Sequence, residues 1–288
     1  MVLVSVVIPT YNRKKLLQKS VRSLLSQSYK NFEIIIVDDG SSDGTENVVK
    51  KFKAVKYIKQ KRRGPATARN TGIKSAKGEI IAFTDDDCEV DCNWLKSIVL
   101  SFRENKEYDA IKGNTKIKTK DKNSFVYHIH KHIYISKNSA ATNNIAYKKK
   151  ALESINFFDE YFHFNYEDCD LLMRFKMKGY KIMYCREAVV YHVFEKNPRE
   201  FKRKHFISGL GMSYFFKKYL SKNPTVSFLV IYHTLLELIY LPKFLLTRLT
   251  KEKYYFSKEY LKIIKSTNVI KGFFIGLITN PKQMSKYI

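Results

Sequence analysis

Short apolar runs bounded by turn residues recur through the N-terminal third of the chain. They cover residues 4–10, 32–37, 55–59 and 80–84. Aliphatic side chains, many of them β-branched, dominate these runs, which is typical of strands that are buried on both faces of a parallel sheet. The stretches between the runs are more polar, and Leu17, Val21 and Leu24 recur there at helical spacing.

Helices are therefore predicted between the strands, over 14–27, after Gly44 and from Pro65 to about residue 76. Strands that alternate with helices form right-handed β-α-β crossovers. The predicted fold class is α/β, with a Rossmann-like, mostly parallel central sheet flanked by helices. In such sheets, ligands bind beyond the carboxyl ends of the strands.

The second half of the chain has a less regular pattern. Residues 108–118 predict a strand, 140–147 a loop that enters a strand, and 167–178 a helix that ends at Gly179. Two further short strands are expected at 181–185 and 188–192. The aromatic and histidine-rich stretch 125–135 favours no single state.

Three consecutive carboxylates, Asp85, Asp86 and Asp87, follow the apolar run 80–84. Like charges repel, and carboxylates resist removal from water, so this arrangement needs a compensating charge. Oxygen ligands of this kind suit Mg²⁺ or Mn²⁺, which are usually shared with substrate phosphates. The alternative is a solvated acidic turn.

Two other strand ends carry polar side chains, Thr10-Tyr11-Asn12 and Asp38-Asp39-Gly40. All three strand ends are expected at one edge of the sheet. No Gly-x-Gly-x-x-Gly fingerprint and no Walker loop follows the first strand, which argues against a nicotinamide cofactor and against P-loop phosphoryl transfer.

Composition adds a strong positive charge to this picture. The 288 residues carry a formal net charge of +26, which favours polyanionic partners, and 44% are hydrophobic, which excludes a disordered composition. The cysteines form no Cys-x-x-Cys pair, so a zinc site is not expected and a reducing compartment is. The N-terminus lacks the features of a signal peptide.

Three segments, in this order and spacing, resemble the family 2 glycosyltransferases. They are 4–13, 37–45, and 68–70 with the run 78–87 that follows it. Glu167-Asp168, with Arg174 and Gly179, is similar to the acceptor-side motif of that family. The resemblance covers roughly residues 4–192 and implies a GT-A fold over 1–198, with a nucleotide-binding half (1–107) and an acceptor half (108–198).

The resemblance implies a metal-dependent, inverting transfer of a sugar from a nucleotide-diphosphate donor. A UDP-sugar is the expected donor, and a hydroxyl of a glycan or lipid-linked acceptor in surface polysaccharide or glycoconjugate synthesis is the expected acceptor. Mn²⁺ or Mg²⁺ is the implied cofactor, held by Asp85, Asp87 and His192. The residues implied to bind the donor are Pro9, Thr10, Tyr11, Arg13, Asp38, Asp39, Arg69, Asp85, Asp86 and Asn144.

Asp168 is the implied general base, because an attacking hydroxyl must lose its proton opposite the leaving group, and Glu167 is its rival. Several of these residues also have structural interpretations. Asp38, Asp39 and Asp168 could cap turns or helices, and Arg69 could form a salt bridge inside the acidic cluster. Asn144 could be a turn amide, and a lone histidine such as His192 is often structural.

The C-terminal stretch 199–288 mixes basic and aromatic residues and predicts an amphipathic helical extension. Its apolar run 226–246 contains charges and a proline, so an interfacial helix fits better than a spanning one. We expect this extension to dock on an anionic membrane, which would make the protein a cytoplasmic one, peripheral on the inner face of the cell membrane. A packing appendage or a surface for a homo-oligomer are the alternatives.

Two other functions compete with glycosyl transfer. A nucleotidyltransferase would also use acids and a metal, but the Gly-rich phosphate loop that it needs is absent after the first strand. A basic protein that binds nucleic acid or membranes is suggested by charge alone, and no nucleic-acid motif supports specific nucleic-acid binding.

Overall fold

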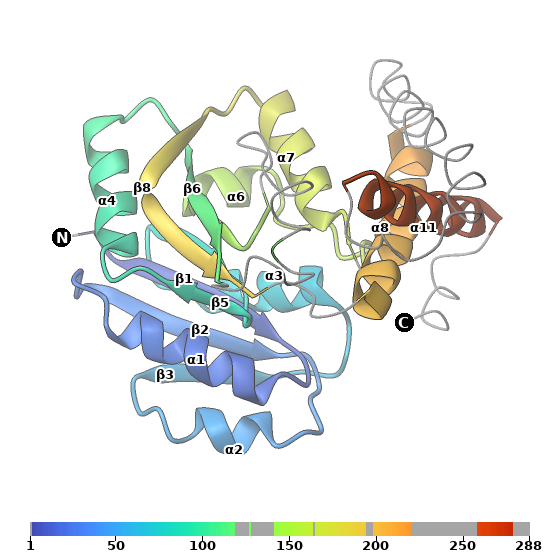
Figure 1. Ribbon diagram of the computed structural model, residues 1–288. Helices are drawn as coiled ribbons and strands as arrows, with labels where there is room; N and C mark the ends of the chain where they lie inside the picture. Colours follow the sequence, from blue (N-terminus) through green and yellow to red (C-terminus); the bar gives the residue numbers. More distant parts are fainter. Residues whose placement is uncertain are drawn as a thin grey trace. The chain divides into compact units, whose positions relative to one another are not determined.

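The computed structural model describes residues 2–118, 127, 141–163, 165–193, 198–219 and 258–278. These residues form two compact units (Figure 1). The first unit contains 2–118, 141–163 and 167–193, and the second contains 127, 165–166, 198–219 and 258–278. The interfacial helix predicted at 226–246, and all but one residue of the stretch 125–135, lie outside the described residues.

A sheet of eight strands forms the centre of the first unit, in the order β3-β2-β1-β4-β7-β6-β8-β5. Its strands are β1 Val4–Thr10, β2 Phe32–Asp38, β3 Val55–Lys59, β4 Ile80–Thr84, β5 Cys88–Val90, β6 Ala110–Ile117, β7 Asn144–Lys148 and β8 Ile182–His192. The first four strands pair in parallel, as their apolar runs predict. Because β1 lies between β2 and β4, the carboxyl ends of these three strands lie together.

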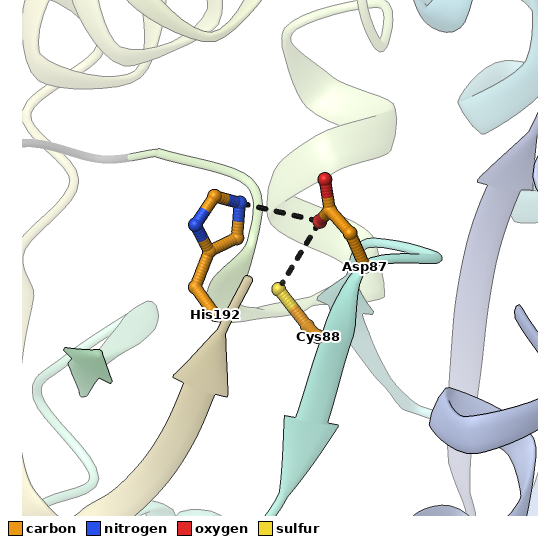
Figure 2. A group of neighbouring side chains, drawn as sticks. All are labelled: Asp87, Cys88 and His192. Carbon is orange, nitrogen blue, oxygen red and sulfur yellow. Dashed lines mark hydrogen bonds and ion pairs between the residues drawn. The ribbon is translucent and has the colours of Figure 1, made fainter. Parts of the chain in front are cut away.

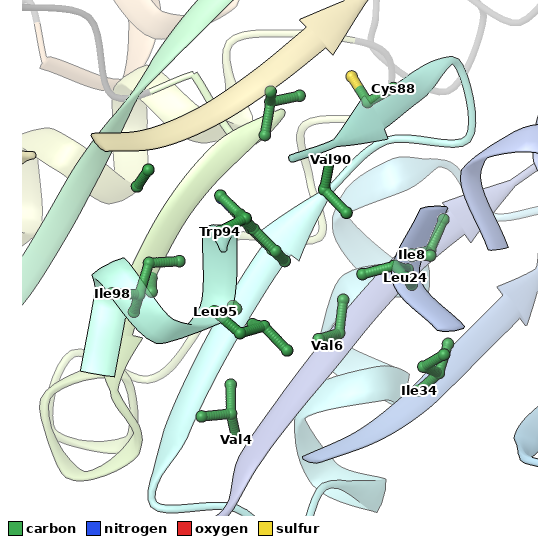
Figure 3. Packing of buried hydrophobic residues seen from close by; sticks show 14 of the residues in the cluster. Val4, Val6, Ile8, Leu24, Ile34, Cys88, Val90, Trp94, Leu95 and Ile98 are labelled. Carbon is green, nitrogen blue, oxygen red and sulfur yellow. The ribbon is translucent and has the colours of Figure 1, made fainter. Parts of the chain in front are cut away.

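Helices cover both faces of this sheet. They are α1 Lys14–Leu25, α2 Thr45–Val49, α3 Pro65–Ser75, α4 Trp94–Glu104, α6 Lys149–Ser154 and α7 Glu167–Met177. One apolar cluster joins α1 and α4 to one face of the strands, and Figure 3 shows Trp94, Leu95 and Ile98 packed beside Val4 and Val6. A second cluster joins α3, α6 and α7 to the opposite face. The alternation of side chains along each buried strand supplies both clusters.

The second half of the sheet is mixed, because β6 and β8 pair in parallel whereas the other pairings are antiparallel. Strand β7 is antiparallel to both β4 and β6, and β5 is antiparallel to β8. The two short strands predicted at 181–185 and 188–192 form one strand, β8, in which the exposed pair Arg186-Glu187 lies at an irregularity of the pairing with β6 and not at a turn. Its pairing with β6 shifts register between Gly113 and Asn114.

Two long helices, α8 Pro198–Tyr219 and α11 Lys258–Ile278, make up most of the second unit. They pack closely because glycines lie where they cross: a Cβ at Gly209 or Gly272 would overlap the backbone of the other helix. Lys217 Nζ donates a hydrogen bond of 2.8 Å to the Gly276 carbonyl. Neither of these helices, nor any other in the described part of the chain, is long and apolar enough to cross a membrane.

Candidate active site

Two arginines, a threonine and a histidine contact the three carboxylates that follow β4. Arg13 Nη1 lies 3.1 Å from Asp86 Oδ1 and 2.8 Å from Asp87 Oδ2. Thr10 Oγ1 donates a 2.8 Å hydrogen bond to Asp86 Oδ2. The end of β1 and the loop after it therefore contact the acids directly, as the parallel pairing of β1 with β4 requires.

Asp86 is the most deeply buried of the three acids, with 4% of its surface exposed. Burial raises the pKa of Asp86 to about 7, and the charges of Asp87 and Asp85 add to the rise, while Arg13 and the Thr10 hydroxyl oppose it. Its side chain already has partners on both oxygens. The structure thus makes Asp86 a support of the loop.

Arg69, on α3, bridges two acids that are far apart in the sequence. Its Nη1 donates to Glu167 Oε1 at 2.7 Å, and its Nη2 donates to Asp85 Oδ1 at 3.0 Å. The arginine is 4% exposed, so both ion pairs are largely shielded from water. The structure therefore supports the salt-bridge interpretation of Arg69, and the contact with a donor phosphate stays a prediction.

Glu167 and Asp168 begin α7, and their surroundings differ. Glu167 is buried against Arg69, and burial raises its pKa to about 7, opposed by Arg69. Asp168 is only half-buried, and its Oδ1 accepts a hydrogen bond from the Cys169 amide at 2.8 Å. Burial raises the pKa of Asp168 too, while Arg69 and Lys112 lower it. Asp168 is thus the more accessible of these two adjacent carboxylates.

A candidate metal site lies where β5 meets β8. The antiparallel register sets Cys88 opposite His192, and Asp87 immediately precedes Cys88. His192 Nε2 lies 3.2 Å from Asp87 Oδ1, and Cys88 Sγ lies 3.7 Å from the same oxygen. Figure 2 shows both side chains directed at the Asp87 carboxylate. One ligand atom from each of these residues lies within 4.8 Å of the others.

The residues present fit a divalent cation. Carboxylate and imidazole are ligands for Mn²⁺ and similar ions, and the Asp87 side chain remains 14% exposed. Burial raises the pKa of the Cys88 thiol well above its usual value, so a neutral thiol is present at neutral pH. Mn²⁺ and Mg²⁺ prefer oxygen and imidazole ligands to sulfur, so Asp87 and His192 are the cation-binding groups that this cluster offers.

Asp39 organises the loop that follows β3. Its Oδ1 accepts hydrogen bonds from Gln60 Nε2 and the Arg63 amide, both at 2.8 Å. Its Oδ2 accepts one from the Gly64 amide, also at 2.8 Å, and has a lone pair left for a ligand. In contrast, Asp38 is fully buried and accepts from the Ser41 amide and the Tyr57 hydroxyl, so it has the turn-stabilising role that was its alternative.

Tyr11 lies in the loop between β1 and α1, with the Arg62 guanidinium carbon 4.3 Å from its ring centroid. The ring is half-buried, and Pro9 at the end of β1 is half-buried as well. The aromatic face at the edge of the sheet is therefore paired with a cation from the Asp39 loop. A flat nucleobase could take the place of that cation.

Asn144 has a structural role that the sequence did not indicate. Its Oδ1 accepts a hydrogen bond from Trp94 Nε1 at 2.9 Å, and its Nδ2 donates to the Ala188 carbonyl at 3.0 Å. The side chain is fully buried, so both polar atoms are used inside the fold. The predicted contact between Asn144 and the donor finds no support in this geometry.

The sequence analysis also missed Lys112, a buried lysine on β6. Its Nζ donates to the Ala141 carbonyl at 3.1 Å. Burial lowers the pKa of Lys112 to about 8, and the charges of Asp168 and Asp85 oppose that shift. A single lysine in so basic a chain gives no signal in the sequence.

Comparison with protein families gives one match that covers more than half of the chain. The family model described as Glycosyl transferase family 2 matches residues 5–174. This region includes the strand ends with Thr10, Asp39 and Asp85, and also the start of α7 with Glu167 and Asp168.

Individual relatives agree with this match. An uncharacterized glycosyltransferase of Rickettsia conorii is 38% identical over 135 residues, which are 46% of this chain and 22% of that protein. A GalNAc(5)-diNAcBac-PP-undecaprenol beta-1,3-glucosyltransferase of Campylobacter jejuni is 36% identical over 116 residues, 38% of this chain and 37% of that protein. The matched region thus spans only a fifth to two fifths of these curated relatives.

Among solved structures, the mannosyltransferase PcManGT of Pyrobaculum calidifontis, in complex with GDP-Man and Mn²⁺, superimposes with a TM-score of 0.69. The alignment covers 96% of this chain and 87% of that one, at 18% sequence identity. At that identity the likeness concerns the fold, which is the GT-A-like arrangement expected from the sequence.

Proposed function

The chain belongs to family 2 of the glycosyltransferases, and we propose that it moves a glycosyl group from a nucleoside-diphosphate sugar to a hydroxyl group. The main observation behind this proposal is the position of Arg69. Arg69 binds Asp85 after β4 and Glu167 at the start of α7, and so fixes the donor-side acids beside the acceptor-side acids. Both halves of a transfer site are thereby held in one place.

A divalent cation, Mn²⁺ or Mg²⁺, would be held by Asp87 and His192. Asp85, the third ligand implied by the sequence, is paired with Arg69 in this structure. When bound, such an ion stabilises the negative charge that develops on a departing diphosphate. Arg13 is half-exposed and contacts Asp86 and Asp87. Its long side chain can turn from these acids toward phosphate oxygens, for which a guanidinium is well suited.

Asp168 is the proposed general base. An acceptor oxygen attacks the anomeric carbon while its proton passes to the Asp168 carboxylate, and the bond between that carbon and the phosphate oxygen breaks. The nucleoside diphosphate leaves with the electron pair. Because attack and departure occur on opposite faces of the sugar, the anomeric configuration inverts. Glu167 would act as a positioning residue through Arg69.

The donor is proposed to carry a base that offers an N–H group to Asp39. Such a hydrogen bond is strengthened by the charge of the carboxylate. Uracil and guanine both have a ring N–H, so UDP- and GDP-sugars are the candidates, and the PcManGT structure is a complex with GDP-Man. Tyr11 and Arg62 would bind the flat face of the base.

Nucleoside-diphosphate release tests the proposal. The purified chain would be incubated with a panel of UDP- and GDP-sugars, with Mn²⁺ or with EDTA. We expect one donor to release its nucleoside diphosphate only with the metal, and NMR of the product to show the inverted anomer. No metal-dependent release from any donor of the panel, or retention of configuration, would contradict the proposal.

The acceptor is proposed to be lipid-linked, with the second unit docking on an anionic membrane surface. The name of the Campylobacter relative includes an undecaprenol diphosphate carrier. The second unit carries exposed basic residues on α8, among them Lys202 and Arg203. Basic residues near an anionic surface each contribute roughly 1 kcal/mol of attraction.

Sedimentation with vesicles tests this docking in the full chain. Binding to phosphatidylglycerol vesicles, but not to phosphatidylcholine vesicles, is expected, and the pair Lys202→Gln/Arg203→Gln should weaken it. The pair Lys15→Gln/Lys19→Gln removes the same charge from exposed positions of α1 and serves as the control. Equal weakening by both pairs would contradict a docking role for α8.

A further inference from the structure

Lys112 is a buried ammonium with one hydrogen-bond acceptor among the described residues. Only 6% of its surface is exposed, and its Nζ donates to the Ala141 carbonyl at 3.1 Å. An ammonium has three N–H donors, and removing it from water is costly unless opposite charges lie near. A methionine or leucine would fill the same space without this penalty, so the charge itself calls for a reason.

The fold fixes where this charge lies. Lys112 pairs with Ile145 of β7 on one side and with Tyr184 of β8 on the other, so its backbone is held from both sides. The next residue, Gly113, lies against the Asn144 amide, and no side chain fits there. Side chains alternate along a strand, so Lys112 shares the sheet face of Ala110, which faces α3 and α7.

Charged and titratable groups from several elements act electrostatically on Lys112 and Asp168. Asp168, Asp85 and Cys88 act on the Lys112 ammonium. Arg69 on α3, Lys112 on β6 and Cys169 on α7 act on Asp168. The charge of Asp168 in turn raises the pKa values of Glu167, of Cys169 and of the buried Tyr147 hydroxyl on β7. Two groups of this set lower the pKa of Asp168 by charge, namely Arg69 and Lys112.

These two cations differ in what else they bind. Arg69 is already paired with Glu167 and Asp85, and its charge is shared between them. Lys112 forms no ion pair shorter than 4 Å within the described part of the chain, and its hydrogen-bond partner is a neutral carbonyl. Its charge is therefore available to the half-buried Asp168.

We propose that Lys112 is a positioning residue for glycosyl transfer, whose buried positive charge keeps Asp168 ionised and thus able to accept the proton of the acceptor hydroxyl. This inference rests on the proposed function, in which Asp168 is the general base. It adds a residue from the middle of β6 to a site otherwise built from strand ends and from the start of α7.

A titration of Asp168 tests the inference without any substrate. Protein labelled with ¹³C at the aspartate carboxyl carbon is titrated in EDTA by NMR, and the Asp168 signal is the one that Asp168→Asn removes. Lys112→Met should raise the midpoint of that signal by about one pH unit, because an opposite charge is lost. Lys112→Arg, which keeps the charge, should leave the midpoint near that of the wild type.

Lys116→Met is the matched control, because it removes the same charge from an exposed position of the same strand. Should Lys112→Met fail to fold, Lys112→Gln replaces it. An unchanged midpoint in the folded uncharged variant, or an equal rise in Lys116→Met, would overturn the inference.

The pH profile of transfer gives the second readout. The acid limb of kcat should move to higher pH in Lys112→Met and return in Lys112→Arg, whereas a purely structural role would lower kcat equally at all pH values. Failure of the proposed function can be distinguished from failure of this inference. If the wild type had no transfer activity, the Asp168 midpoint would still be higher in Lys112→Met than in the wild type.

Discussion

Glu167 and Asp168 are adjacent in the sequence, but their side chains have different partners. The first is buried in an ion pair with Arg69, at 2.7 Å, and the second is half-buried and accepts the amide of its neighbour Cys169 on Oδ1. A general base must reach a substrate proton, so accessibility favours Asp168. A carboxylate locked to an arginine is a better support than a base.

Substituting each carboxylate separately tests this division of roles. Asp168→Asn should lower kcat by about 10²–10⁴-fold, the usual contribution of a general base, with little change in donor affinity. Glu167→Gln should mainly lower the thermal midpoint of unfolding and change kcat less, because it leaves Arg69 with one ion pair fewer. Steady-state kinetics, donor calorimetry and thermal unfolding measure the three quantities. A larger kcat loss in Glu167→Gln would exchange the two roles.

The sequence indicated most of these residues by type, but it did not reveal their partners. Three acids after a strand predict a charged site, and Asp86 and Asp87 do lie beside Thr10 and Arg13. Whether Arg69 faces phosphate or carboxylate depends on α7, because Glu167 follows Arg69 by 98 residues. Lys112 was missed, and the hydrogen bonds of Asn144 inside the fold were not foreseen, because burial and not residue type decides them.

At the level of elements, α3 lies on β1 with very little space between them. Gly72 faces Val7, and a Cβ at Gly72 would overlap the Val7 side chain. Arg69 belongs to the same helix, one turn earlier, so the distance between α3 and β1 also sets where its guanidinium lies. Close packing at Gly72 therefore supports the ion pairs of the site.

Gly72→Ala should lower the free energy of unfolding. Overpacking costs about 1–3 kcal/mol, which exceeds the gain of about 1 kcal/mol from helix propensity. The double variant Gly72→Ala/Val7→Ala should be less destabilised than the sum of its parts, because the added methyl then has room. Urea unfolding measures all three variants, and strict additivity would contradict the packing argument.

Gly179→Ala is a useful comparison at the end of α7. Gly179 has a φ of +82°, with nothing within 4 Å of an added Cβ. Gly179→Ala should lower the free energy of unfolding by about 1–2 kcal/mol, because alanine is strained in this left-handed conformation. The destabilisation caused by Gly179→Ala should be the same with Val7→Ala as without it.

Element boundaries were predictable where the apolar pattern was local. The observed β1 and β3 coincide with the runs 4–10 and 55–59, and α7 begins at Glu167 as expected. Strand β8 was split in the prediction because Arg186-Glu187 looks like a turn, although two exposed side chains are compatible with a strand. No element was predicted for 88–104, where β5 and α4 lie, although Trp94, Leu95, Ile98 and Phe102 recur there at helical spacing.

For the whole molecule, the buried acids link stability to pH. The pKa values of Asp86 and Glu167 are raised to about 7 in the folded state, whereas unfolded carboxyls have pKa values near about 4. The folded state therefore binds more protons between these values. This contribution to stability is fully present below about pH 4 and is lost as the pH rises through about 7.

In EDTA, the free energy of unfolding should fall between about pH 4 and pH 7, with a slope of up to about 1.4 kcal/mol per pH unit for each such group. Glu167→Gln should flatten the slope, and the exposed Glu107→Gln should not. Urea unfolding at several pH values measures this slope of the free energy of unfolding. Lys112 acts in the opposite sense at higher pH, since its folded pKa of about 8 lies below that of a free lysine.

The sheet topology shows where prediction from the sequence reached its limit. Alternating strands and helices led to the parallel half, β3-β2-β1-β4. The antiparallel insertion of β7 between β4 and β6 joins segments that are far apart in the chain, and no local pattern encodes that pairing. This pairing also brings Ala141 and Lys112 together, so the missed topology and the missed residue have one cause.

The central claim is that the acids after β4 hold a divalent cation against a nucleoside diphosphate. Isothermal titration of UDP and of GDP into the protein, with Mn²⁺ and with EDTA, tests this claim most directly. The wild type and Glu107→Gln should bind one of the two nucleotides only with Mn²⁺, and Asp87→Asn should lose that binding. Metal-independent binding, or wild-type affinity in Asp87→Asn, would contradict the account.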